Sequence, residues 1–578
     1  MKLSPDKKLA GVLCPVFSIR TESDLGIGDT EGVRQMIDWC HRHGFGVLQV
    51  LPINETSGDS SPYNAVSSLA IEPTTVAISP ELIPDLSKAD FDRLVTPELL
   101  NELRSGPVRY GKVKPLKRSL LRAAFDAFLI ENWEKGTPRK IAFDAFVAAN
   151  GDWIADYAIF RVLMEEHNNW PTWDKWPEVE QDPQTATSWL LSLPEDRREQ
   201  LMQKLVFFQY VQWIAFEQWT KLKEYAQKKK VFLVGDIPFG VSPYSADVWA
   251  NRDIFDLNWS GGAPPEGTFG DSEFTRHWGQ NWGIPLYRWD VLRERNFDWW
   301  RMRIENVHKI FHAFRVDHAL GFYRIYAFPW PPSRNAEFAK LTETEALEKT
   351  EGLLPRFFPG PDETEEEQAA NLAQGDELLR MVKDAATDTV VIAEDLGTVP
   401  PYVRPHLLQL EIPGFKVPHW ERTPDYEYMD GADYPRLSVC TPSTHDHDPL
   451  AGMWRRMWRE HEEALLQNDK EKVHATWLEL QRFCKWCGLD PENIPRDFSR
   501  TVHEAYCRRV LESNSWLAVF QLADVFGQET RLNVPGSVGT ANWSARLDKT
   551  VSELDHDPQT LHKVQSFTKL VKESNRKH

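Results

Sequence analysis

The chain has 578 residues, with 67 Lys and Arg against 86 Asp and Glu, and therefore a formal net charge of −19. Because nucleic-acid backbones and anionic membrane surfaces attract basic patches, this charge argues against either as a partner. Hydrophobic residues make up 41% and charged residues 26%, a composition typical of a globular protein with a sizeable core.

The N-terminal segment and the cysteines indicate the expected compartment. The N-terminus, MKLSPDKKLAGVL, has no apolar stretch of signal-peptide length. No run of about 18 apolar residues occurs, so no membrane span is expected. Six cysteines in 578 residues are too few for a disulfide framework. We therefore expect a cytoplasmic protein.

Short runs of apolar and β-branched residues recur along the chain, and each ends in polar residues. Strands that are apolar on both faces and alternate with helical patterns are typical of a parallel sheet. Eight such runs predict the α/β class and a (β/α)8 TIM barrel, whose active site lies at the carboxyl ends of the strands. The runs cover residues 9–17, 46–52, 231–239, 310–318, 389–397, 413–418, 437–446 and 517–527.

Three connections between these runs are much longer than simple βα loops. Residues 53–230 are expected to form a mainly helical insertion between strands 2 and 3. Further insertions are expected at residues 331–388, between strands 4 and 5, and at residues 449–516, between strands 7 and 8. No Gly/Ser-rich linker separates independent domains. The sequence therefore predicts one catalytic domain over residues 1–578.

Three of the predicted strands end in carboxylates that would meet at one mouth of the barrel. Asp317 follows the fourth strand, and Glu394 and Asp395 follow the fifth. Asp446 and Asp448 follow the seventh. Carboxylates gathered in this way must be protonated, paired or bound to a cation. Cleavage of a glycosidic bond with retention uses such a group, because one carboxylate attacks the anomeric carbon and another, with a raised pKa, protonates the leaving oxygen.

Other polar residues would lie close to these carboxylates. Arg315 lies two residues before Asp317 and therefore on the same strand face. A fixed cation there would keep Asp317 ionised, as a nucleophile requires, although a structural ion pair is the alternative. Asp236 ends the third strand, and Tyr63 follows the second.

The run His445, Asp446, His447 and Asp448 has residue types that can bind a metal. No second cluster of His and Asp with suitable spacing accompanies it. We therefore expect sugar contacts rather than a metal at this run. No cofactor is expected, since the sequence has no dinucleotide fingerprint.

Residues 261–289 are rich in Gly and Pro and carry Phe269, Trp278 and Trp282. This composition predicts a mobile loop that covers the cleft and stacks aromatic rings on sugars. A surface loop pinned by aromatic anchors is the alternative.

Taken together, these motifs resemble those of the 4-α-glucanotransferases (amylomaltases or disproportionating enzymes), which form glycoside hydrolase family 77. The resemblance extends from about residue 11 to residue 546. It implies a barrel with large helical insertions, without the C-terminal β-sandwich of typical α-amylases, and a retaining double displacement. The matching segments are SPYN, GDIPFGVSPYSADVW, GAPP, PLYRW, FRVDHALGF, IAEDLG, STHDHD and RLNVPGSVGTANW.

The resemblance also implies roles for individual residues. Asp317 would be the nucleophile, Glu394 the general acid/base and Asp446 the transition-state stabiliser. It thereby chooses Glu394 over Asp395, a choice that the residues alone leave open. Glu266 stands where the family usually has Asp. The implied sugar contacts are Tyr63, Asp236, Arg315, His318 and His445 at the cleavage point, and Glu266, Phe269 and Trp282 on the acceptor side.

We therefore expect an enzyme that cuts an α-1,4-glucan and passes the glycosyl part to the 4-hydroxyl of another sugar. Maltooligosaccharides and longer α-1,4-glucans would be donor and acceptor, and glucose would be an acceptor or a product. An α-amylase-like hydrolase that uses water as acceptor is one alternative, and a non-catalytic glucan-binding protein is another. A binding protein has no need to keep Arg315, Asp317, Glu394 and Asp446 together, which argues against the second alternative.

Overall fold

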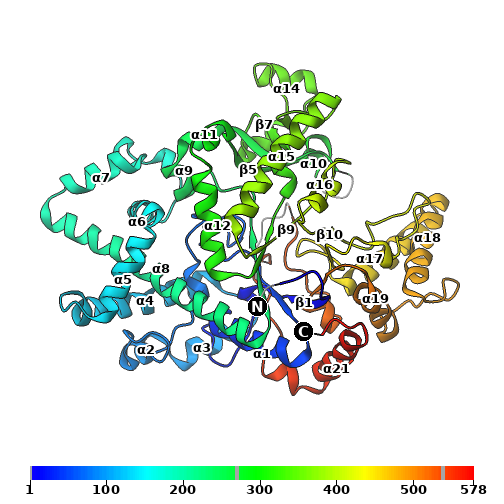
Figure 1. Cartoon of the computed structure of the whole chain (residues 1–578), viewed down its shortest axis with the longest axis horizontal. Coiled ribbons are helices and arrows are strands. Elements are labelled where there is room, and N and C mark those ends of the chain that lie inside the picture. Colours follow the sequence, from blue (N-terminus) through cyan, green and yellow to red (C-terminus); the bar gives the residue numbers. More distant parts are fainter. Residues whose placement is uncertain (1–2, 267–271, 536–540, 578) are drawn as a thin grey trace.

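Figure 1 shows the computed structural model of the chain, which describes residues 3–266, 272–535 and 541–577. In these residues eight parallel strands form a nearly closed barrel, in the order β10, β11, β12, β1, β2, β3, β6 and β9. Each sequence run contains one of these strands, so the predicted barrel is confirmed. The strands are β1 (Leu9–Leu13), β2 (Val47–Gln49), β3 (Phe232–Ile237), β6 (Ala313–Val316), β9 (Val390–Ala393), β10 (Gly414–Lys416), β11 (Ser438–Cys440) and β12 (Leu517–Gln521).

Helices surround the barrel and fill the long connection between β2 and β3 (Figure 1). That connection holds α2 to α8, in the region for which the sequence predicts a helical insertion. The bounds are α1 (Thr30–His43), α2 (Lys88–Leu94), α3 (Pro97–Arg104), α4 (Tyr110–Phe128), α5 (Pro138–Ala149), α6 (Gly151–Glu166), α7 (Pro183–Ser192) and α8 (Glu195–Lys229).

The later connections are also mainly helical. Residues 331–388 contain α13 to α15 and one strand, β8, and residues 449–516 contain α17 to α19. The bounds are α9 (Ala246–Ala250), α10 (Glu273–Trp278), α11 (Trp289–Glu294), α12 (Asp298–Ile310), α13 (Asn335–Phe338), α14 (Glu343–Lys349), α15 (Glu365–Ala386), α16 (Val403–Gln409), α17 (Leu450–Leu466), α18 (Lys470–Cys487), α19 (Arg500–Glu512), α20 (Leu522–Phe526) and α21 (Pro558–Glu573).

Capping residues set the ends of several helices. The Asp29 side chain accepts hydrogen bonds from backbone N–H groups at the start of α1, and Gly44 ends that helix with a φ of 82°. At the start of α15, Thr364 and Glu367 form a capping box, so the acidic run there lies where the helix dipole favours negative charge.

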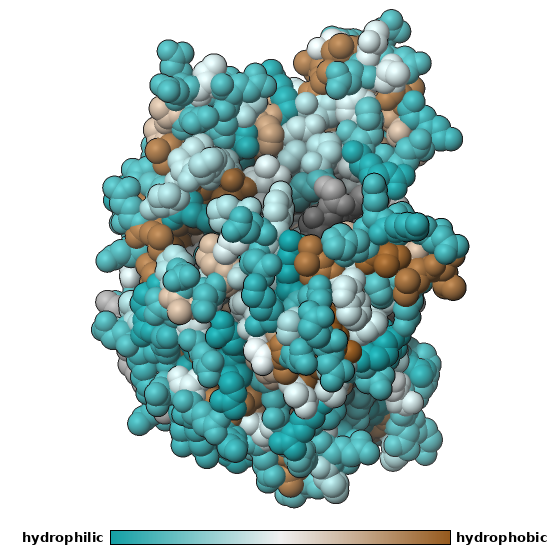
Figure 2. All heavy atoms as spheres, turned by 90° about the vertical axis from the view of Figure 1, so that its right-hand side faces the viewer, coloured by the Kyte–Doolittle hydropathy of each residue, from teal (hydrophilic) through white to brown (hydrophobic). Residues whose placement is uncertain are grey.

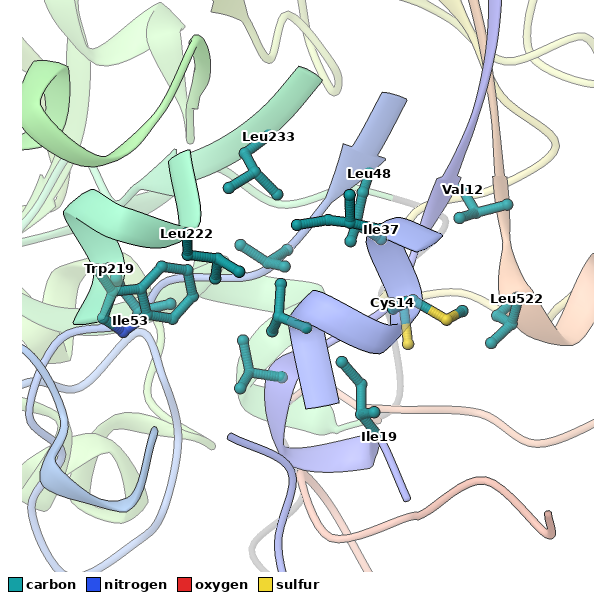
Figure 3. Close-up of a cluster of buried hydrophobic side chains, with 14 of the residues drawn as sticks. Val12, Cys14, Ile19, Ile37, Leu48, Ile53, Trp219, Leu222, Leu233 and Leu522 are labelled. Atoms are coloured by element: carbon teal, nitrogen blue, oxygen red, sulfur yellow. The ribbon is translucent and has the colours of Figure 1, made fainter. Parts of the chain in front are cut away.

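The barrel strands are apolar on both faces because each face packs against a different core. Leu48 of β2 and Leu233 of β3 belong to one buried cluster with Ile37 of α1 and Trp219 of α8 (Figure 3). Val47, next to Leu48 on the same strand, belongs to a separate cluster formed mainly by residues of the barrel strands. This double burial explains why the runs lack polar alternation.

A second sheet, which the sequence patterns do not indicate, is antiparallel and has the strand order β5, β4, β7, β8. The expected loop over residues 261–289 is therefore wrong over most of its length, because much of it forms strand and helix. Trp278 is buried, with 4% exposure, in a small apolar cluster. The strands are β4 (Phe255–Ala263), β5 (Gln280–Tyr287), β7 (Ile325–Phe328) and β8 (Arg356–Phe358).

Figure 2 shows that one face of the molecule is mostly hydrophilic, with apolar side chains in separate groups. Among the helices of the described residues, none combines the length and the apolar composition needed to cross a membrane.

Candidate active site

The three sequence-predicted carboxylates follow three barrel strands and line one cleft at the carboxyl ends of the strands. Asp317 follows β6, Glu394 follows β9, and Asp446 follows β11. The cleft has a volume of about 2290 Å³. Parallel strands deliver their last residues to the same end of a barrel, which brings these distant residues together.

Arg315 is the cation at the centre of this group. Its Nη1 donates to both carboxylate oxygens of Asp236, at 2.9 and 2.8 Å. Its Nη2 lies 2.7 Å from Oδ1 of Asp317 and 3.9 Å from Oε2 of Glu394. The Arg315 side chain is 5% exposed, whereas Asp317 keeps 30% exposure. One buried guanidinium therefore orients Asp317 while leaving that carboxylate accessible from the cleft.

Glu394 is held by two backbone donors. The N–H of His318 donates to Oε2 at 2.8 Å, and the N–H of Leu396 donates to Oε1 at 2.9 Å. Burial raises the pKa of Glu394 to about 7, and the negative charge of Asp317 adds to this, while Arg315 opposes it. A carboxyl group with this pKa can hold a proton near neutral pH, as a general acid requires.

Asp446 has the opposite electrostatic environment. Burial alone would raise its pKa, but His445, with Nε2 3.3 Å from Oδ2, and Asn533, which donates to Oδ1 at 2.6 Å, together hold the pKa well below its usual range. Arg531 donates to the backbone carbonyl of Asp446. Asp446 is therefore ionised in the pH range where Glu394 is protonated.

Asn533 and Arg531 are members of the site that the sequence patterns do not indicate. Both lie in the segment RLNVPGSVGTANW, which carries part of the family resemblance. The polar side chains of this segment could have marked it as part of a site. No periodicity, however, links them to Asp446, which lies more than eighty positions earlier.

Aromatic rings form the walls beside the carboxylates. The rings of Tyr63 and His445 stack with centroids 5.1 Å apart, and the Tyr63 hydroxyl donates to Asp236 at 2.8 Å. The ring of Trp282 meets His318 edge-on at 4.7 Å and is 40% exposed. Burial lowers the pKa of His318 to about 4, so its imidazole is neutral at neutral pH.

The remaining predicted residues lie at different depths. The Asp236 side chain is 0% exposed and lies beneath Arg315 and Tyr63, outside the cleft lining. Burial raises its pKa to about 6. Glu266 lines the cleft, and its Oε1 accepts from the N–H and the hydroxyl of Thr398, both at 2.9 Å. Phe269 lies outside the described residues.

Asp395 and Asp448 have other partners, although the sequence alone could not distinguish them from Glu394 and Asp446. Asp395 is 2% exposed and accepts from the backbone N–H of Phe415 at 2.6 Å and from Arg404 at 3.2 Å, so it joins β9 to β10. Asp448 lies 3.3 Å from Arg531. Neither side chain belongs to the cleft lining.

The described residues contain no group of three or more His, Cys, Asp and Glu side chains placed to hold a metal ion. Within the run that has metal-ligand residue types, His447 Nδ1 lies 2.8 Å from the hydroxyl of Thr444, and Asp448 pairs with Arg531. These side chains therefore bind different neighbours.

A family model described as 4-alpha-glucanotransferase matches residues 14–551 of the chain. The chain belongs to the 4-alpha-glucanotransferase family. A relative of that name from Chlamydia pneumoniae is 30% identical over 554 residues, covering 94% of this chain and 92% of the relative. A second, from Chlamydia caviae, is 29% identical over 575 residues, covering 97% and 94%.

Among solved structures, the amylomaltase from Streptococcus agalactiae in complex with acarbose has a TM-score of 0.72 and 22% identity. The match covers 99% of this chain and 100% of that chain, and it shows that the two share a fold. The chain is thus an enzyme of the 4-alpha-glucanotransferase family with an amylomaltase-like barrel.

Proposed function

We propose that the enzyme transfers a segment of an α-1,4-glucan to the 4-hydroxyl of an acceptor sugar through a covalent glycosyl intermediate on Asp317. One observation carries the proposal: three strand-end carboxylates share one cleft but have three different environments. Asp317 is paired with Arg315, Glu394 has a pKa of about 7, and Asp446 has a pKa below its usual range. Such divergence assigns different acid/base tasks to similar groups.

In the first step, Asp317 attacks the anomeric carbon while Glu394 gives its proton to the leaving glycosidic oxygen. The C–O bond to the leaving sugar breaks as the bond to Asp317 forms. The ionised Asp446 stabilises the positive charge that develops on the sugar ring. In the second step, Glu394, now ionised, takes the proton from the acceptor 4-hydroxyl, which displaces Asp317 with overall retention.

The surrounding residues have supporting roles in this proposal. Arg315, His318, His445 and Tyr63 line the cleft and would contact the sugar at the cleavage point. Asp236 is buried beneath the guanidinium. We therefore assign Asp236 to holding Arg315 and Tyr63 in place rather than to contact with the sugar.

The test of the function is chromatography of the products formed from pure maltotriose, with a parallel assay of reducing ends. We expect a ladder of longer and shorter maltooligosaccharides with the total of reducing ends unchanged. Rising reducing ends without longer products would identify a hydrolase instead. No turnover of maltotriose or of longer donors, together with glucan binding, would identify a binding protein.

Transfer requires that an acceptor occupy the cleft before water reaches the intermediate. Replacing Trp282 with Ala removes an exposed ring beside His318 and is expected to raise the ratio of hydrolysis to transfer about tenfold, the effect of losing one aromatic contact. The ratio is measured as new reducing ends per chain transferred. Trp170, 67% exposed and outside the cleft lining, gives the matched control Trp170→Ala. An unchanged ratio in Trp282→Ala would remove this role.

A further inference from the structure

The cleft is larger than cleavage of one bond requires. Its volume of about 2290 Å³ exceeds the roughly 300–1,000 Å³ of a typical small-molecule site. Part of the excess is lined by residues that take no part in the proposed chemistry. This part, which we call the outer arm, is lined by Trp173, Asp174, Tyr244, Leu257, Asn258 and Trp259.

One wall of the outer arm runs directly from the catalytic residues. The ring of Phe239 meets that of His318 at 6.3 Å, and further along the same segment the carbonyl of Pro243 accepts from Nε1 of Trp173 at 2.8 Å. Tyr244, the next residue, is five positions from Phe239, and five residues of extended chain span at most about 18 Å. An oligosaccharide bound at the cleavage point can therefore reach the outer arm if it is several sugars long.

A second wall of the outer arm is a bulge in β4. Asp256 pairs with Leu286 of β5 and Ser260 pairs with the adjacent Pro285, so residues 257–259 are inserted between consecutive pairs. Bulges of this kind redirect side chains out of a sheet. The side chain and backbone N–H groups of Asn258 both donate to Asp256 at 3.0 Å, which fixes the insertion.

The side chains that line the two walls match a neutral sugar chain. Leu257 is 46% exposed, an apolar surface on which the C–H face of a sugar can pack. Burial, together with the charge of Asp174, raises the pKa of the Tyr244 phenol, which is therefore a neutral donor and acceptor. Asp174 and Asn258 are exposed and add acceptors and a donor for sugar hydroxyls. The carboxylate disfavours an anionic ligand.

The walls are held in position by groups outside the arm. The guanidinium of Arg252 lies over the Trp173 ring at 5.1 Å. The ring of Phe358 meets Trp259 edge-on at 4.7 Å, and Arg356 lies 5.1 Å from the same ring. The arm is thus a preformed surface.

From this arrangement we propose that the outer arm is a remote subsite for an α-1,4-glucan chain, which makes the enzyme prefer long glucans over maltotriose. This inference rests on the proposed function. The arm would bind sugars several units from the cleaved bond. Its contribution to kcat/KM would therefore depend on the length of the glucan and not on the cleavage step itself.

The test compares kcat/KM for maltoheptaose and for maltotriose in the double variant Tyr244→Ala/Leu257→Ala. We expect the preference for maltoheptaose to fall about tenfold, as the loss of an aromatic and an aliphatic contact predicts. Tyr426 is 70% exposed and lies outside the cleft lining, so Tyr426→Ala is the matched control and should keep the wild-type preference. An equal loss for both substrates, or no loss, would overturn the proposal.

A second measurement separates this proposal from the proposed function. Maltoheptaose binding is followed by calorimetry in the wild type and in the double variant. If the wild type lacks transferase activity, the proposed function fails, but weaker maltoheptaose binding by the double variant would still support the outer arm. Equal binding by the two proteins would overturn it.

Discussion

Replacing Asp317 with Asn is expected to abolish both transfer and hydrolysis, with a loss of at least about ten-thousand-fold, the scale seen when a nucleophile or its partner is removed. The change keeps the shape of the side chain but removes the charge that faces Arg315 at 2.7 Å. An amide is also a far weaker nucleophile than a carboxylate. The measurement is product formation from maltotriose and, separately, from α-maltosyl fluoride.

The fluoride donor makes this prediction specific to the nucleophile. Fluoride leaves without being protonated, so a donor of this kind bypasses the general acid but not the attacking group. Asp317→Asn should therefore be inactive with both donors. The matched control is Asp290→Asn, since Asp290 has a side chain 71% exposed and lies outside the cleft lining. Wild-type release of fluoride by folded Asp317→Asn would exclude Asp317 as the nucleophile.

The barrel and its carboxylates were predictable because they depend on local patterns. Each barrel strand is buried on both faces, so it leaves an apolar run in the sequence, and the residues that follow the run lie at the carboxyl end of the barrel. Asp317, Glu394 and Asp446 are found in this way, and Arg315 follows from its spacing on the same strand as Asp317. The family resemblance then implies the separate roles that we propose for them.

The second sheet was not predictable on the same basis. Its strand β4 contains a three-residue bulge at 257–259 and three consecutive residues, 261–263, that are Gly or Ala, so neither face shows the alternation of a regular strand. It pairs with β7, with Gly261 opposite Ala327, through antiparallel contacts between distant parts of the chain that no local signal reveals. The Gly- and Pro-rich segment therefore looked like a loop.

The sequence also could not show how deeply each carboxylate is buried or which distant residues contact it. Asp236 ends a strand as Asp317 does, but only the fold shows that Asp236 is fully buried beneath Arg315 while Asp317 is accessible. Asn533, which donates to Asp446, comes from a segment without secondary-structure periodicity. Both facts depend on tertiary packing, which sets the pKa of each carboxylate.

Replacing Glu394 with Gln is expected to separate the two chemical steps. With maltotriose, kcat/KM should fall at least about a thousand-fold, because the leaving oxygen is no longer protonated. With α-maltosyl fluoride the first step should proceed, since no acid is needed. The second step should then stall, because Gln cannot take the proton of the acceptor. The glycosyl–enzyme should accumulate, and its mass should exceed that of the free enzyme by one maltosyl unit attached to Asp317.

The pH dependence gives an independent test of the same residue. Glu394 has a pKa raised to about 7, so it is protonated below that pH and loses the proton as the pH rises. In the wild type, kcat/KM for maltotriose should therefore fall above about pH 7, approaching tenfold per pH unit, as expected for a single required proton. With α-maltosyl fluoride this decline should be absent from the first step.

The matched control is Asp395→Asn, because Asp395 is the neighbouring carboxylate and accepts from Phe415 on the far side of β9. The Asp395→Asn substitution should lower the free energy of unfolding. It should leave unchanged the decline of kcat/KM above about pH 7 and the ratio of the activities with maltotriose and with α-maltosyl fluoride. If Asp395→Asn rather than Glu394→Gln removed the decline of kcat/KM above about pH 7, the general acid would be Asp395. The raised pKa of Glu394 would then reflect burial alone.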